Sequence, residues 1–204
     1  MAELTLTTFV TLDGVMQAPG GPKEDTTGGF RHGGWTVPYW DADFGRLVDE
    51  RFRPVTGFLL GRRTYEIFAG YWPHQKDPDN VVAARLNGCP KWVVSTTLTP
   101  EQADWPGTTV ISSDVPDAVA GLKADVAGEI QIHGSGRLAQ SLMAEGLIDE
   151  YRLYVFPVVI GDGRRLFAEG AVPTGFQLVG TETTSKDVVL HTYRPAGPAA
   201  FGSY

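Results

Sequence analysis

The chain has 204 residues, 42% of them hydrophobic and 20% charged, which is the composition of a globular protein long enough to bury a core. Its formal net charge of −7 argues against binding to a nucleic-acid backbone, which needs a basic surface. The longest apolar run, residues 154–160, is far shorter than the ~20 residues of a membrane span, and no secretory leader is visible, so we expect a cytoplasmic protein without a membrane partner.

Strand-like and helix-like segments alternate along the chain. In order, the patterns predict a strand over 4–12, a helix over 41–52 capped by Asp41, a strand over 57–60 leading into a helix at 61–66, a helix over 80–86, strands over 92–95 and 108–111, a helix over 115–123, a strand over 129–133, a helix over 136–145, a long strand over 150–160, and strands over 176–184 and 188–194.

This order predicts an α/β domain with a mostly parallel central sheet, helices on both faces and a C-terminal antiparallel hairpin. We expect one domain over residues 1–194 and a flexible tail over 195–204, which is rich in Gly, Ala and Pro. The glycine-rich segment 18–34 is long for an irregular stretch inside a domain, so we expect it either to serve function or to be disordered.

The segment Ile130-Gln131-Ile132-His133-Gly134-Ser135-Gly136 is a β-branched strand that ends in glycines where a helix begins. Glycines let a ligand approach the backbone, and a helix N-terminus offers unpaired N–H groups to a phosphate. A tight strand-to-helix turn without a ligand explains the same pattern. The sequence leaves these two interpretations open.

Two further strand ends carry similar residues. Gly61-Arg62-Arg63-Thr64 places two arginines in the first turn of a helix, where cations oppose the helix dipole unless an anion is present. Ser95-Thr96-Thr97 follows the next strand. Solvated arginines and a simple strand cap are the alternatives. Because ligands of open α/β sheets bind at the carboxyl ends of strands, the three sites together predict an extended phosphorylated ligand such as a dinucleotide.

Candidate groups for a substrate lie in the first 41 residues. Asp13 ends the first strand and is either a general acid or an Asx-turn residue. Trp35, Tyr39 and Trp40 precede Asp41, and they either wall a pocket for a planar heterocycle or pack beside a helix cap. The histidines have no metal-ligand spacing, so we expect no metal.

The order of these motifs resembles the dihydrofolate reductase-like superfamily, and within it the C-terminal reductase domain of the riboflavin-biosynthesis deaminase/reductase. The matching stretches are TLDG, GFxHGGWxxPY, LLGRRTYE, VVSTTL, IHGSGRLAQSL, LIDEYRLYVFPVVIGDGRRLF and the final hairpin, which together span nearly the whole chain.

The resemblance implies a three-layer NADPH-dependent reductase fold and a set of cofactor contacts. Those positions are Gly14, Val15, Gly61, Arg62, Arg63, Thr64, Ser95, Thr96, Gly134, Ser135, Gly136, Arg137 and Leu138. Arginines beside a 2′-phosphate would favour NADPH over NADH. The family implies a homodimer, which the apolar long strand over 150–160 also favours.

One departure concerns the substrate. Dihydrofolate reductases carry W-x-x-P-x-[DE], but here Trp40 holds the acid position and Asp41 stands one residue later, a shift of ~100° on a helix. We therefore predict a reductase acting on a small planar heterocycle, pterin-like or pyrimidine-like. Asp13 or Asp41 would orient the substrate or help protonate it, Trp35, Tyr39 and Trp40 would be the walls, and segment 18–34 would be a lid. A non-catalytic NADP(H)-binding sensor or interaction module is the alternative, and a scaffold without a ligand is a third.

Overall fold

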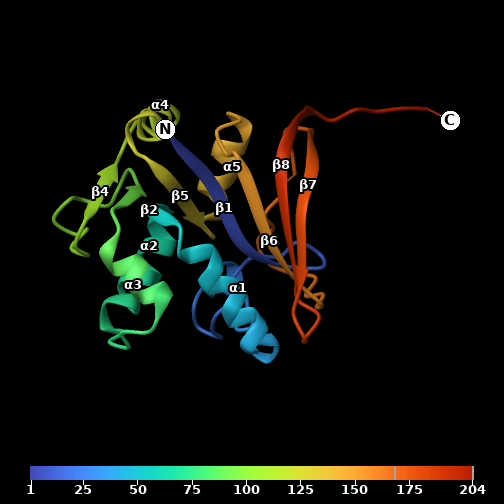
Figure 1. Cartoon of the computed structure of the whole chain (residues 1–204), viewed down its shortest axis with the longest axis horizontal. Helices are drawn as coiled ribbons and strands as arrows, with labels where there is room; N and C mark the ends of the chain where they lie inside the picture. Colours follow the sequence, from blue (N-terminus) through green and yellow to red (C-terminus); the bar gives the residue numbers. More distant parts are fainter. Residues whose placement is uncertain (168, 204) are drawn as a thin grey trace.

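The computed structural model describes residues 1–167 and 169–203. Within these residues an eight-stranded sheet runs in the order β4-β3-β2-β5-β1-β6-β8-β7 (Figure 1). The strands are β1 (Ala2–Thr11), β2 (Val55–Gly61), β3 (Lys91–Val94), β4 (Thr108–Ile111), β5 (Gly128–His133), β6 (Glu150–Phe156), β7 (Thr174–Thr183) and β8 (Val189–Pro198). The α-helices are α1 (Ala42–Phe52), α2 (Arg62–Ala69), α3 (Val81–Gly88), α4 (Val115–Asp125) and α5 (Gly136–Ala144).

Strand pairing confirms the predicted mostly parallel sheet with a C-terminal hairpin. Every pair from β4 to β6 in the sheet order is parallel, and β8 is antiparallel to both β6 and β7. The carboxyl ends of β1, β2, β3 and β5 consequently lie along one edge of the sheet, where open α/β sheets bind ligands.

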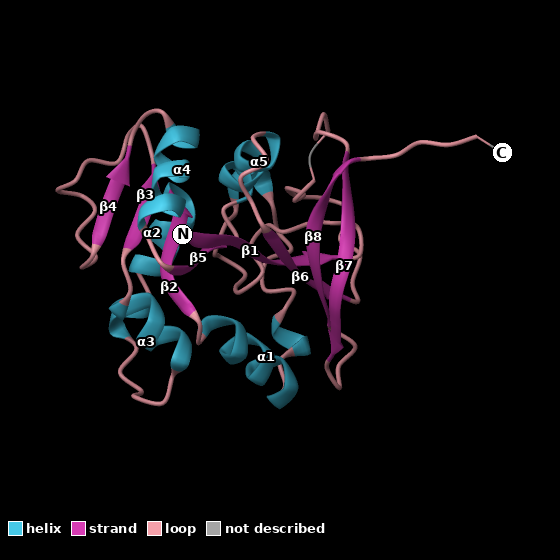
Figure 2. Ribbon diagram, turned by 45° about the horizontal axis from the view of Figure 1, so that its top comes forward, coloured by secondary structure: helices cyan, strands magenta, loops and turns pink. Residues whose placement is uncertain are grey.

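Helices cover both faces of the sheet, as predicted (Figure 2). On one face Phe44 and Leu47 of α1 pack with Phe58 of β2 in a buried cluster, and on the other Leu138 and Leu142 of α5 pack in a second cluster. Side chains of successive strand residues point to opposite faces, so the consecutive apolar residues Phe58, Leu59 and Leu60 of β2 supply both clusters at once. Burial on both faces explains why the centre of β2 is a continuous apolar run.

Helix α1 begins where the sequence predicts. The carboxylate of Asp41 accepts a hydrogen bond from the Phe44 amide at 2.7 Å, which satisfies one free N–H of the first turn. Phe44, Leu47, Val48 and Phe52 form its buried stripe. Of the described helices none is long and apolar enough to cross a membrane.

Two predicted boundaries are wrong. The strand predicted over 150–160 ends at Phe156, because Pro157 has no amide to continue the ladder and the amides of Ile160 and Gly161 bond instead to the Asp13 carboxylate.

Residues 195–198, predicted as part of the tail, belong to β8 and pair with the start of β7. The pairing of β8 with β6 stops at Tyr193, so Pro195 and Pro198 lie where one edge of β8 is unpaired and proline is tolerated.

Candidate active site

Two of the predicted phosphate motifs meet at the carboxyl ends of β2 and β5, which are neighbours in the sheet. The Gly61 amide donates to the Ser135 hydroxyl at 3.0 Å, and the Ser135 amide donates to the Thr64 hydroxyl at 3.2 Å. These bonds hold the N-terminus of α2 beside the N-terminus of α5. The two helix N-termini therefore lie side by side at this edge of the sheet, and each favours an anion.

The turn between β5 and α5 needs its glycines. Gly134 and Ser135 both adopt left-handed backbone conformations, with φ of 58° and 50°. A side chain on Gly136 would place Cβ 2.7 Å from the sulfur of Met16, so the Met16 side chain would have to shift to admit one. Gly134 carries no side chain, so a pyrophosphate can approach the backbone of the turn there.

The two arginines of the α2 motif turn to different partners. Arg62 donates to Glu66 at 2.7 Å and to the Thr97 hydroxyl at 2.5 Å, toward the segment that follows β3. Arg63 donates to the carboxylate of Asp25 at 2.7 Å and to the hydroxyl of Thr27 at 2.6 Å. Arg62 therefore faces the end of β3, and Arg63 faces the glycine-rich segment.

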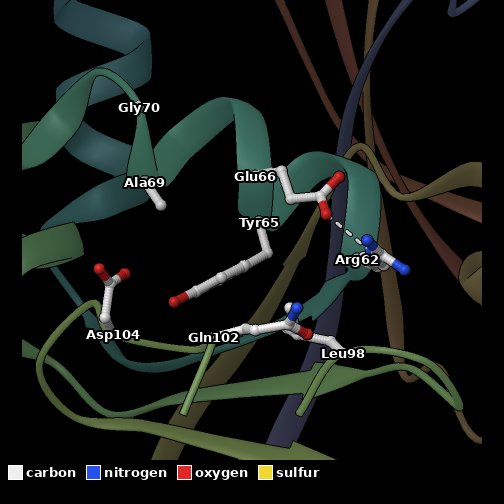
Figure 3. Close-up of a pocket in the computed structure, with 8 residues that line it drawn as sticks. All are labelled: Arg62, Tyr65, Glu66, Ala69, Gly70, Leu98, Gln102 and Asp104. Atoms are coloured by element: carbon white, nitrogen blue, oxygen red, sulfur yellow. Dashed lines mark hydrogen bonds and ion pairs between the residues drawn. The ribbon is translucent and has the colours of Figure 1, made fainter. Parts of the chain in front are cut away.

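A groove of about 360 Å³ lies along the Arg62 side of α2 (Figure 3). Its lining residues are Arg62, Tyr65, Glu66, Ala69, Gly70, Leu98, Gln102 and Asp104. Tyr65 is buried, and its hydroxyl accepts the Trp105 amide at 3.1 Å, which ties α2 to the segment across the groove. The groove thus adjoins Arg62 and lies on a different face of α2 from Thr64.

The hydroxyls after β3 differ in exposure. The Ser95 hydroxyl accepts the amides of Thr97 and Leu98 at 3.2 and 2.9 Å, so it closes a turn. Thr96 is exposed. Of this predicted pair only Thr96 presents a side chain to solvent.

Three predicted cofactor positions, Val15, Arg137 and Leu138, differ in whether the side chain or only the backbone can contact a ligand. The side chains of Val15 and Leu138 are buried, so only their backbones can contact a ligand. Arg137 is exposed in the first turn of α5 and forms no ion pair with any other described residue. Its guanidinium therefore lies next to the bare turn.

The carboxylate of Asp13 is fully engaged. It accepts the Thr11 hydroxyl at 2.6 Å and the amides of Ile160 and Gly161 at 3.2 and 2.8 Å. The hydrogen bond from Thr11, with those two amides, lowers the pKa of Asp13 to about 2. Gly14 follows it in a left-handed conformation, with φ of 79°. The geometry favours the turn interpretation of Asp13.

Asp41 is engaged in the same way. One oxygen caps α1 through the Phe44 amide, and the other accepts the Ser185 hydroxyl at 2.7 Å. The Phe44 amide first, and Ser185 next, lower the pKa of Asp41. Both predicted acids are therefore ionised near neutral pH.

The three aromatic residues do not form one wall. Trp35 is buried against Phe156 and donates its indole N–H to the Gln17 carbonyl at 2.8 Å. Tyr39 also packs on Phe156, whereas Trp40 packs on Phe44 and is 48% exposed. Trp35 thus anchors the glycine-rich segment to the core.

A buried histidine precedes the glycine turn. The His133 ring lies among Phe9, Phe52 and Phe68, with centroid separations of 5.5 to 5.6 Å. Its Nδ1 is buried and, within the described part of the chain, has no hydrogen-bond partner. Burial lowers the pKa of His133 to about 4, so the ring is neutral at pH 7.

The sequence reasoning missed Asp25 and Arg164. The side chain of Asp25 is only 6% exposed and pairs with both Arg63 and Arg164. Burial alone would raise the pKa of Asp25, but hydrogen bonds from Thr27 and Arg63 outweigh it and lower the pKa to about 2. The adjacent acids Glu24 and Asp25 in a glycine-rich stretch, and the paired arginines of Gly163-Arg164-Arg165, were the available signals.

The family model of the RibD C-terminal domain matches residues 2–190 of this chain. The chain belongs to the RibD C-terminal domain family. This member of the RibD C-terminal domain family is 26% identical over 187 residues to YyaP, an uncharacterized protein of Bacillus subtilis (strain 168), and the alignment covers 90% of each protein.

Solved structures share the fold of this RibD C-terminal domain. A pyrimidine reductase-like protein from Corynebacterium diphtheriae superposes with a TM-score of 0.65 at 16% identity, covering 95% of this chain and 92% of that one. Dihydrofolate reductase from Enterococcus faecalis, complexed with NADP(H), superposes with a TM-score of 0.58 at 16% identity, covering 95% and 96%. These likenesses confirm the dihydrofolate reductase-like fold, and with the family they support a reductase-type function.

Proposed function

We propose that the chain is an NADPH-dependent reductase that transfers a hydride to a small planar heterocycle, pterin-like or pyrimidine-like. The observation that carries the proposal is the junction of Gly61, Thr64 and Ser135, where two helix N-termini meet beside a bare glycine turn. The family and its reductase neighbours add support.

The residues at this junction fit a dinucleotide. The turn of Gly134, Ser135 and Gly136 would hold the pyrophosphate, with the exposed guanidinium of Arg137 beside it. Arg62, close to Thr97 and to the exposed Thr96, would hold the phosphates of the adenosine half. NADPH, when bound, supplies the hydride, and the protein supplies orientation and electrostatics.

We keep Asp13 and Asp41 as residues that contact the substrate, but with only one of their two predicted roles. As carboxylates they can accept hydrogen bonds from the N–H groups of a heterocycle, but at neutral pH they hold no proton to donate. We assign them orientation rather than proton donation. The exposed ring of Trp40 and the edge of Tyr39 are the apolar surfaces nearest Asp41 in sequence.

The test is a titration with NADPH and, separately, NADH, followed by quenching of tryptophan fluorescence. Micromolar binding of NADPH and much weaker binding of NADH support the proposal. A panel of dihydropterins and aminopyrimidines, monitored by oxidation of NADPH, then identifies the substrate class. Absence of binding by either dinucleotide overturns the proposed cofactor.

The alternative is an NADP(H)-binding sensor or interaction module without catalysis. The observation that favours it is the engagement of both candidate acids in structural hydrogen bonds. Tight NADPH binding with no oxidation across the panel would support this alternative, and turnover of any heterocycle would exclude it.

We also propose a homodimer in the cytoplasm, with a small molecule as its other partner. The apolar end predicted for the strand over 150–160 no longer supports the dimer, because that strand stops at Phe156. Exposed apolar side chains on the edge strand β7, Leu178 and Val179, offer a replacement surface. Light scattering at micromolar concentration decides between monomer and dimer.

A further inference from the structure

We propose that Arg63 and Arg164 together form a phosphate-binding site, and that the carboxylate of Asp25 is its internal occupant, which a ligand's phosphate displaces. The inference rests on the proposed function, because it assumes a phosphorylated ligand at the turn of Gly134 to Gly136. It adds Arg164 to the site and gives the glycine-rich segment a defined role in binding.

The groups around Asp25 are the donor set that a phosphate needs. Arg63 donates to one carboxylate oxygen at 2.7 Å, and Arg164 donates to the other. The hydroxyl of Thr27 accepts from both guanidiniums, at 2.6 and 2.7 Å. Guanidinium groups match carboxylate and phosphate oxygens with the same planar fork, so an anion that fits one fits the other.

The site borders the proposed pyrophosphate turn on two sides. Arg63 precedes Thr64, whose hydroxyl accepts the Ser135 amide at 3.2 Å. On the other side the Arg164 carbonyl accepts the Met16 amide at 2.8 Å, and the Met16 sulfur lies against Gly136. Arg63 and Arg164 therefore belong to the two segments that contact the turn.

The exposure of the three side chains indicates how a phosphate would replace the Asp25 carboxylate. The side chains of Arg63 and Arg164 are 52% and 42% exposed, whereas that of Asp25 is 6% exposed. A ligand can reach both guanidiniums from solvent while the carboxylate lies beneath them. The pyrophosphate of a dinucleotide carries one negative charge on each of its two phosphoryl groups, against the single charge of the Asp25 carboxylate, so it can pair with both cations.

The segment that carries Asp25 is anchored near its ends by buried Ala18 and Phe30. It is also held at Asp25 itself, because the Gln17 side-chain amide donates to the backbone carbonyls of Asp25 and Thr27 at 3.1 and 3.0 Å. Exchange therefore moves the Asp25 side chain first, and the flanking Lys23 and Arg31 are exposed. Releasing Asp25 thus exposes a short stretch without removing the anchors. While Asp25 is paired with the two arginines, it lowers the apparent affinity of the protein for the phosphate, because only molecules in which Asp25 is released can bind it.

A purely structural ion pair gives a different expectation. If Asp25 only fastens the segment, removing its charge loosens residues 18–34 and leaves anion affinity unchanged or weaker. If Asp25 competes with the ligand, removing its charge strengthens anion binding. The sign of the change separates the two roles.

The experiment measures binding of inorganic pyrophosphate and of NADPH by calorimetry to the wild type, Asp25→Asn and Arg164→Ala. We expect Asp25→Asn to bind pyrophosphate about tenfold more tightly and Arg164→Ala about tenfold more weakly. Glu50→Gln is the matched control, because it removes one negative charge from an exposed pair with Arg46 and should change nothing. Equal pyrophosphate affinities in the wild type and Asp25→Asn overturn the inference.

Limited trypsin digestion of the wild type gives a second readout that does not depend on a variant folding. Pyrophosphate should speed cleavage after the exposed Lys23, which lies between the two anchors and two residues before Asp25, because it releases that stretch. Unchanged or slower cleavage overturns the inference. If Asp25→Asn strengthens pyrophosphate binding but NADPH binds neither protein, the phosphate site stands and the proposed cofactor fails. If NADPH binds both proteins equally, the cofactor stands and the displacement fails.

Discussion

Ser135 and Thr64 join the two halves of the candidate cofactor site through one hydrogen bond, 3.2 Å from the Ser135 amide to the Thr64 hydroxyl. Ser135 is held in a left-handed conformation that costs a non-glycine residue roughly 1–2 kcal/mol. The Gly61 amide, which donates to the Ser135 hydroxyl at 3.0 Å, fixes the same residue from β2. The strained turn is therefore maintained by contacts from the neighbouring motif.

Thr64→Val should weaken this junction while keeping the shape of the side chain. The Ser135 amide loses its acceptor, which costs about 1–3 kcal/mol of stability for a partly buried donor. We expect NADPH to bind several-fold more weakly, as measured by fluorescence titration. Thr109→Val, on the exposed face of β4, is the control. Wild-type NADPH affinity in Thr64→Val would remove the junction from the site.

Arg62, rather than Arg63, should distinguish NADPH from NADH. Both arginines pair with an acid, Arg62 with exposed Glu66 and Arg63 with buried Asp25, but only Arg62 faces Thr97 and the end of β3. Arg62→Gln is expected to weaken NADPH binding about tenfold and to leave NADH binding within about twofold, since only NADPH carries the 2′-phosphate. Arg46→Gln is matched, because Arg46 also pairs with an acid four residues later. Equal losses for both dinucleotides would contradict the assignment.

The phosphate motifs were predictable because each is local. A strand, a glycine and a helix start within a few residues place Gly61 and Gly134 at the same sheet edge once β2 and β5 are parallel. Asp25 and Arg164 are 139 residues apart, so no local pattern connects them. The end of β6 was mispredicted for the same reason, because the amides after Phe156 are taken by Asp13 from the far end of β1.

The candidate acid Asp41 shows the same limit of prediction from local sequence. An acid beside aromatics in the sequence is compatible with catalysis or with capping, and only the position of its partners decides. For Asp41 those partners are the Phe44 amide, three residues away, and Ser185 in the C-terminal hairpin. The first was predictable as a helix cap, and the second was not.

Asp41 should behave as a cap and not as an acid. Asp41→Asn keeps a side-chain oxygen for the Phe44 amide, so we expect nearly wild-type Tm and turnover. Asp41→Ala removes the acceptor, so it should lower Tm and, because Asp41 is proposed to orient the substrate, raise KM. Thermal unfolding and the substrate panel measure the two effects. A large loss of kcat in Asp41→Asn with an unchanged Tm would restore Asp41 as a catalytic group.

Arg152, Glu129 and Glu150 form a buried ion cluster outside the candidate site, and we expect it to contribute strongly to the stability of the fold. Arg152 contacts Glu129 with two bonds, at 2.7 and 3.1 Å, and Glu150 with one at 2.8 Å, and the side chains of all three are 9% exposed. Arg152→Met leaves buried Glu129 without its cation and Glu150 with Arg194 alone, at 3.1 Å, so we expect a loss of about 3–5 kcal/mol in urea unfolding.

The control for Arg152 is Arg46→Met, which breaks an exposed pair and should have little effect. Adding Glu129→Gln to Arg152→Met removes one of the stranded charges and should restore part of the stability. If Arg152→Met is as stable as Arg46→Met, the cluster contributes no net stability.

His133 should make stability fall as the pH falls below about 6.5. Its pKa is lowered to about 4 in the folded protein, against ~6.5 in an unfolded chain, so between these values the unfolded state binds the extra proton. Stability from this group is complete above pH 6.5, and about 1–2 kcal/mol is lost by pH 5. The pKa values of Asp13 and Asp25 are lowered to about 2, so the stability that depends on these carboxylates is lost only below the pH range in which His133 acts.

Replacing His133 by Phe tests the source of this pH dependence. The ring sits among Phe9, Phe52 and Phe68, so a phenyl ring suits its surroundings and removes the unpaired buried nitrogen. Urea unfolding at pH 5 and pH 8 should show a smaller difference in His133→Phe than in the wild type, whereas His74→Gln, which removes an exposed imidazole, should keep the wild-type difference. An unchanged difference in His133→Phe would mean that another group titrates between these pH values.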